Sequence, residues 1–74
     1  MNRWLLTVCI PQGPTPIVGS LIDLAERRPV AMGGEIMIVA NFAYDTEQVA
    51  EDARARIEGA NLGAICFINS FHAA

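Results

Sequence analysis

The chain has 74 residues, enough for a single domain, and 53% of them are hydrophobic while only 18% are charged. Its net charge at pH 7 is −3, with five arginines, no lysine and eight acidic residues. Binding to nucleic acid usually requires a clustered basic surface, and these arginines are scattered along the sequence, so we expect no nucleic-acid partner. A small domain with more apolar side chains than it can bury tends to oligomerise or dock, which favours another protein chain as partner.

An apolar run near the start raises the question of a membrane or export segment. Trp4–Ile10 is short, and Pro11, Pro14 and Pro16 interrupt the sequence that follows it. A spanning helix needs about 20 continuous apolar residues, and a secretory signal peptide needs a longer apolar core and a small-residue cleavage site. We therefore expect no membrane partner and a cytoplasmic protein.

The first expected element is a strand over Arg3–Ile10, which Pro11 ends because proline supplies no backbone donor. A helix should follow, with Thr15-Pro16 as its cap and first position. Arg27 and Arg28 suit the negative end of its dipole, and Pro29 stops it. The side chains expected to face inward from this helix are Ile17, Val18, Leu21, Ile22 and Ala25.

Pro29–Met32 is interpreted as a short edge strand or, alternatively, as loop. Gly33-Gly34 predicts a tight turn into Glu35–Phe42, the apolar and β-branched stretch that we expect to be a central strand.

A second helix is expected to begin at Asp45 or Thr46, with Asp45 and Gln48 in the spacing of a capping box. Its expected inward residues are Val49, Ala50, Ala53, Ile57 and Ala60, with an Asp52–Arg56 pair on its surface and an end at Gly59 or Asn61. Leu62–Phe71 is the expected closing strand.

This order of elements predicts a two-layer α/β sandwich with the ferredoxin-like βαββαβ pattern in one domain over residues 1–74, or a three-stranded βαβαβ variant if Pro29–Met32 is loop. If both helices cover one face, the residues expected beneath them are Trp4, Leu6, Val8, Ile10, Ile36, Ile38, Ala40, Phe42, Ile65, Phe67 and Phe71, with Asn69 as a polar exception. The opposite face would carry Leu5, Thr7, Cys9, Met37, Val39, Ala64, Cys66, Ile68 and Ser70.

That second face would be more apolar than a solvated sheet surface normally is. We expect a second copy or a different protein to cover it. The residues expected to make the contact are Leu5, Met37, Val39 and Ile68, or the acidic side of the second helix at Glu47, Glu51 and Asp52. The function that this favours is a small non-catalytic protein-interaction module, acting as a dimer, adaptor or inhibitor; phage-encoded inhibitors such as anti-CRISPR proteins resemble the chain in size and character.

Catalytic and metal chemistry find little support in the sequence. Cys9 and Cys66 lie in separate apolar runs and are expected to be buried free thiols, with a cross-strand disulfide as the alternative if their strands are neighbours. The single histidine, His72, is close to the end of the sequence, and no Cys-x-x-Cys pair occurs. We therefore expect no catalytic residue, no metal and no cofactor.

One loop offers an alternative function. Gln12, Gly13 and Thr15 precede a helix N-terminus, whose backbone donors can bind a small anion. A turn before an apolar helix that ends in Leu24-Ala25-Glu26-Arg27 is similar to the layout of ligand-sensing ACT domains over about the first third of the chain, although the Pro-Gly-x-Leu pattern of that family is missing. The resemblance implies a small-molecule-sensing regulatory domain. A further alternative is a small dimeric ferredoxin-like enzyme with an apolar pocket.

Overall fold

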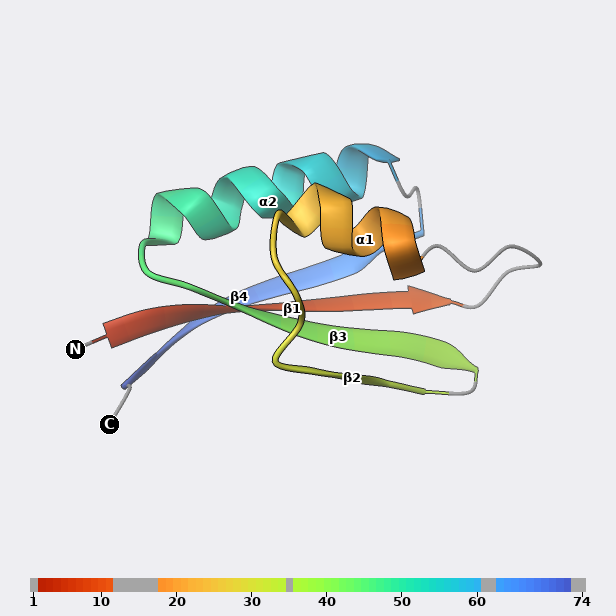
Figure 1. Ribbon diagram of the computed structural model, residues 1–74, viewed down its shortest axis with the longest axis horizontal. Helices are drawn as coiled ribbons and strands as arrows, with labels where there is room; N and C mark the ends of the chain where they lie inside the picture. The colour runs from red at the N-terminus through yellow and green to blue at the C-terminus, as the bar shows by residue number, and fades with distance from the viewer. Residues whose placement is uncertain (1, 12–17, 35, 61–62, 73–74) are drawn as a thin grey trace.

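The computed structural model describes residues 2–11, 18–34, 36–60 and 63–72. Over these ranges the chain forms β1 (Asn2–Pro11), α1 (Val18–Ala25), β2 (Ala31–Gly33), β3 (Met37–Tyr44), α2 (Glu47–Ala60) and β4 (Ile65–His72). The strands form one antiparallel sheet in the order β2-β3-β1-β4, and both helices lie on the same side of it (Figure 1). This α+β arrangement is compatible with a ferredoxin-like two-layer sandwich and confirms the four-stranded prediction.

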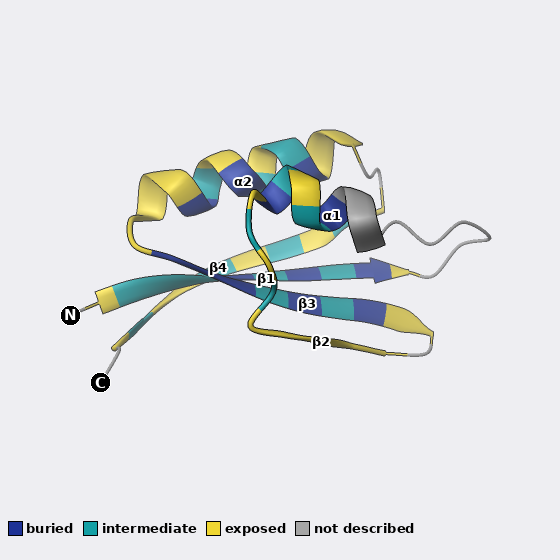
Figure 2. Ribbon diagram, in the orientation of Figure 1, coloured by how far each residue is buried: buried dark blue, intermediate teal, exposed yellow. Residues whose placement is uncertain are grey.

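The buried core lies between the sheet and the helices (Figure 2). Alternate residues of the two central strands point into it, which confirms the inward faces predicted for both strands. The small alanines of α2 let that helix approach the strands closely. The core cluster comprises Leu6, Val8, Ile10, Leu21, Ala25, Ala40, Phe42, Tyr44, Ala50, Ala53 and Ile57.

The first helix ends three residues before the predicted position, at Ala25. Glu26 adopts a left-handed backbone conformation with a φ of 59°, which ends the helical hydrogen-bond pattern. Side chains of other elements satisfy the last carbonyl groups instead. Arg56 Nε donates to Leu24 O at 2.7 Å, and the Tyr44 hydroxyl donates to Ala25 O at 2.9 Å. These bonds tie the end of α1 to α2 and β3.

The hairpin of β2 and β3 confirms the predicted edge strand, but both strands start later than predicted. Gly33 pairs with Val39 within the sheet, so it belongs to β2 rather than to the turn. Gly34 has a φ of 127°, and a Cβ there would lie 1.8 Å from the Met37 carbonyl oxygen, so only glycine fits. The prediction that Ile36 points into the core is wrong: it precedes β3 and is 88% exposed.

The second helix is capped by Thr46, the second of the two predicted caps. Thr46 Oγ1 accepts a hydrogen bond of 3.2 Å from the Val49 amide. Asp45 instead pairs with Arg3, with 3.2 Å between Oδ1 and Nε. Val49 and Ala60, predicted to face inward, are exposed because the helix turns its other predicted residues, Ala50, Ala53 and Ile57, toward the sheet.

The predicted pair between Asp52 and Arg56 is wrong. Arg56 reaches across to α1, where its Nη2 lies 2.9 Å from Glu26 Oε2. Asp52 accepts a hydrogen bond of 2.9 Å from Gln48 Nε2 on its own helix. The contact between the two helices therefore directs Arg56 away from its i−4 neighbour.

The last strand shows the opposite face assignment from the one predicted. Cys66 pairs with Val8, and Ile68 pairs with Leu6. Val8 and Leu6 are fully buried beneath the helices, so Cys66 and Ile68 share that face. The residues predicted to point inward lie on the other face of the sheet: Ile65, Phe67, Asn69 and Phe71. The outward set of β4, with Ile65, Phe67 and Phe71, is the more apolar one, so hydrophobicity alone favoured the wrong face.

Candidate interaction surface

The side of the sheet away from the helices, which we call the open face, is lined by alternate residues of all four strands. Figure 1 shows no helix on this side. The strand registers place on it Arg3, Leu5, Thr7, Cys9 and Pro11 of β1, Ala31 and Gly33 of β2, Met37, Val39, Asn41 and Ala43 of β3, and Ile65, Phe67, Asn69 and Phe71 of β4.

The apolar part of the open face is continuous across three strands. Cys9 is paired with Val39 on one side and with Ile65 on the other. Phe67 lies two residues further along β4, on the same face. Ile65 and Phe67 are 52% and 53% exposed, and Met37 is 39% exposed. Large apolar side chains therefore meet solvent side by side on a rigid sheet.

Polar side chains also lie on the open face, which is less uniformly apolar than predicted. Thr7 Oγ1 donates a hydrogen bond of 2.7 Å to Asn41 Oδ1 across the two central strands. Asn69, predicted to point inward, lies on the open face opposite Leu5. These groups provide fixed hydrogen-bonding positions between the apolar residues.

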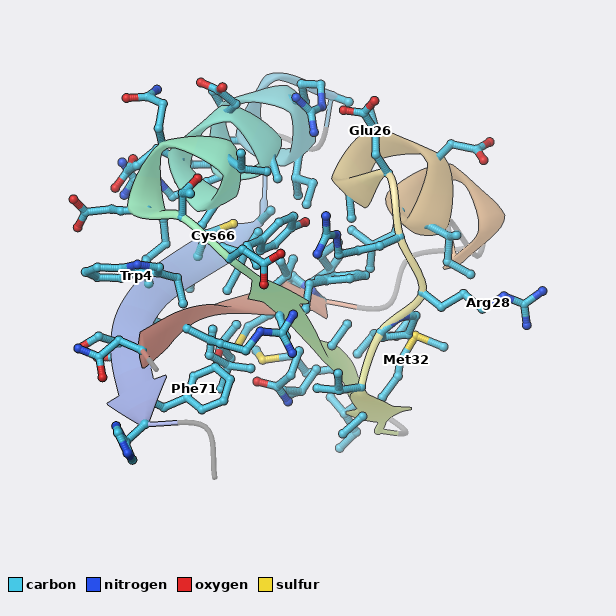
Figure 3. All side chains as sticks on the ribbon, turned by 60° about the vertical axis from the view of Figure 1, so that its left-hand side comes forward. Trp4, Glu26, Arg28, Met32, Cys66 and Phe71 are labelled. Atoms are coloured by element: carbon cyan, nitrogen blue, oxygen red, sulfur yellow. The ribbon has the colours of Figure 1, made fainter. Side chains whose placement is uncertain are left out.

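The structure places three of the four contact residues predicted for the sheet on the same face. Leu5, Met37 and Val39 lie on the open face as predicted. Ile68 does not, because it packs against the core beneath the helices. Phe71 lies below the sheet and Cys66 lies between the sheet and the helices (Figure 3).

The exposed residues of β4 could not be identified from the sequence of that strand alone. The sequence indicates the inward face more clearly in β1, where one set of alternate residues is clearly more apolar than the other. The register against β1 then determines which residues of β4 face outward, and they are Ile65, Phe67, Asn69 and Phe71.

The predicted acidic contact residues lie on α2, in the other layer of the molecule. Glu51 forms an ion pair with Arg54 one turn along the helix, and Asp52 accepts the hydrogen bond from Gln48. Glu47 is exposed in the first turn, where its charge suits the positive end of the helix dipole. Local interactions thus explain the positions of these acids, and the structure does not join them to the open face.

The two cysteines are unbridged and lie on opposite faces of the sheet. Cys9 is on the open face, whereas Cys66 packs beneath the helices. Their strands are neighbours, but side chains that leave a sheet on opposite sides cannot form a disulfide. Burial, reinforced by the nearby Glu58 carboxylate, raises the pKa of Cys66 to about 11. Its thiol therefore remains protonated and weakly nucleophilic at neutral pH.

The buried ring of Tyr44 packs against the half-buried side chain of Arg27. The Arg27 guanidinium carbon lies 4.2 Å from the centroid of the Tyr44 ring, and Arg27 Nη1 donates to the Ala43 carbonyl. Burial raises the pKa of Tyr44, while the charge of Arg27 opposes that shift. Because the hydroxyl donates to Ala25 O, Tyr44 joins the end of α1 to β3.

The other residues considered for ligand or metal chemistry lie away from the open face or outside the described residues. Gln12, Gly13 and Thr15, together with the predicted helix start at Thr15-Pro16, lie outside the described residues. His72 Nδ1 lies 3.2 Å from Asn2 Oδ1 at one end of the sheet. Within the described ranges, no three His, Cys, Asp or Glu side chains lie close enough together to hold a metal ion.

Neither a protein-family model nor a curated protein sequence matches the chain. Neither of the two helices that the structure describes is long and apolar enough to cross a lipid bilayer.

Proposed function

We propose that the protein is a small non-catalytic protein-interaction module that binds another protein chain through its open face. The observation that carries the proposal is the half-exposed pair Ile65 and Phe67, held beside Cys9 and Val39 on the side of the sheet opposite the core. Removing apolar surface of this kind from water lowers the free energy, so binding a partner over it is favourable.

The arrangement suits a protein partner better than a small molecule. A small-molecule site is normally a concave pocket with a few convergent polar groups. The open face is a sheet surface on which aromatic and aliphatic side chains alternate with Thr7, Asn41 and Asn69. Exposed aromatic and aliphatic anchors with a few hydrogen-bonding groups between them are typical of the central part of a protein interface. Adaptor and inhibitor roles both follow from such binding.

We further propose that the protein acts in the cytoplasm. Cys9 and Cys66 lie on opposite faces of adjacent strands, so they cannot form a disulfide with each other. Unbridged thiols are typical of proteins that work in a reducing compartment. Fractionation of source cells followed by immunoblotting tests this location.

The interaction is tested by comparing proteins captured from source-cell lysate by the wild type, Phe67→Asp and Val49→Asp. Val49 is the matched control because it is an apolar residue 43% exposed on α2, in the other layer. We expect Phe67→Asp to lose a partner that Val49→Asp retains, since burying an unpaired carboxylate is costly. Capture of the same proteins by wild type and Phe67→Asp would contradict the proposal.

A further inference from the structure

The strand β4 forms one edge of the sheet along its whole length. The strand order places β2 at one edge and β4 at the other. β2 has only three residues, whereas β4 has eight and is paired in the described part of the chain with β1 alone. About half of the backbone N–H and C=O groups of such a strand point away from the sheet and need hydrogen-bond partners.

β4 lacks the features that usually prevent pairing at a sheet edge. Ile65–His72 contains no proline and no Asp, Glu, Lys or Arg. Its pairing with β1 runs from Asn2 opposite His72 to Cys9 opposite Ile65 without a skipped residue, so there is no bulge. Long, regular and uncharged edges readily add a further strand.

We propose that a second copy of this chain pairs its β4 antiparallel to this one, across a two-fold axis perpendicular to the sheet. The two four-stranded sheets then become one continuous sheet, with all helices on one side and both open faces on the other. This contact uses the edge of the sheet rather than its open face, so it goes beyond the function proposed above and stands or fails separately.

The distribution of charge favours β4 over α2 as the element at which two copies meet. Each chain carries a net charge of −3, so two copies repel each other at long range. α2 carries six charged residues, whereas β4 carries none when His72 is neutral. Contact along β4 therefore brings the copies together at an element that adds no charge of its own to their repulsion.

The sequence of β4 is also compatible with pairing to itself. In a two-fold antiparallel pair, residues of one open face must lie opposite residues of the other open face. One residue of β4 therefore lies directly opposite its own counterpart in the second copy, with the axis between them. An axis at Ile68 places Ile65 opposite Phe71 and Phe67 opposite Asn69 of the second copy. An axis at Asn69 places Phe67 opposite Phe71. Both arrangements pair seven of the eight residues of β4 and join large apolar side chains across the contact.

The proposal is tested by sedimentation equilibrium of the purified full chain between about 1 and 200 µM, a range that covers micromolar dissociation constants. We expect wild type to approach twice its mass of 8.0 kDa. Asn69→Lys should weaken dimerisation by about fivefold or more, because it places like charges across the axis or a charge against Phe67. Asn69 is exposed, so this change leaves the core intact.

Val39→Lys is the matched control, since Val39 lies on the open face in β3, which is separated from β4 by β1. We expect this variant to dimerise like wild type. Hydrogen exchange supplies a second readout: β4 amides should gain protection as protein concentration rises. A monomer throughout the range would overturn the proposal, as would a dimer that Val39→Lys dissociates and Asn69→Lys does not. That last result indicates contact through the open face instead.

Discussion

Gly34 joins β2 to β3 in a backbone conformation that residues with a side chain rarely adopt. Its φ is 127°, and the carbonyl oxygen of Met37 occupies the place of a Cβ. Gly33, its neighbour, has open space where a Cβ would be. The two adjacent glycines therefore differ in what they contribute to the hairpin, although the sequence presents them as a pair.

We expect Gly34→Ala to lower the free energy of unfolding by about 2–3 kcal/mol, because it combines backbone strain with a steric clash. Gly33→Ala should change it by less than about 1 kcal/mol. Urea unfolding followed by circular dichroism measures both. Equal effects of the two substitutions would show that the hairpin does not have the described geometry.

At the scale of the element, α1 is held at its C-terminal end by side chains rather than by a glycine cap. Tyr44 of β3 and Arg56 of α2 bind its last carbonyl groups, and Glu26 pairs with Arg56. The helix is short, so these long-range bonds contribute more to its position than intrinsic helix propensity does.

Tyr44→Phe removes only the hydroxyl that donates to Ala25 O. We expect it to lower the free energy of unfolding by about 1–2 kcal/mol, since it leaves a buried carbonyl without its donor. Thr7→Val removes a hydrogen bond to Asn41 on the open face, where water can replace it, and should cost less than about 1 kcal/mol. An unchanged free energy of unfolding for Tyr44→Phe in urea titrations would contradict a stabilising role for its bond to α1.

The order of elements could be predicted from the sequence because proline, glycine and capping residues mark most of their ends. Faces could be predicted where the inward set of alternate residues is clearly the more apolar one, as in β1, where Leu6 and Val8 lie on one face and Thr7 on the other. In β4 the more apolar set faces outward, and only the pairing with β1 reveals this. The hydrogen bonds of Arg56 and Tyr44 to α1 involve residues far apart in sequence, so local patterns gave no sign of them.

At the scale of the whole molecule, the chain is a sheet with helices on one side and an accessible surface on the other. The sequence predicted a sheet face without helical cover, because a chain this short and this apolar cannot bury every apolar side chain. The predicted composition of that face was partly wrong: Ile68 belongs to the core, while Phe67 and Asn69 belong to the open face. The proposed interaction thus depends on the orientation of β4.

That orientation is tested most directly by the reactivity of two thiols one residue apart. In a Cys9→Ser background, the natural Cys66 is compared with the variant Cys66→Ala, Phe67→Cys. Cys66 points beneath the helices and its pKa is raised to about 11, whereas position 67 faces solvent. At pH 8 we expect iodoacetamide to modify the thiol at position 67 at least about tenfold faster, followed by mass spectrometry. Faster modification of Cys66 would contradict the structure of the open face.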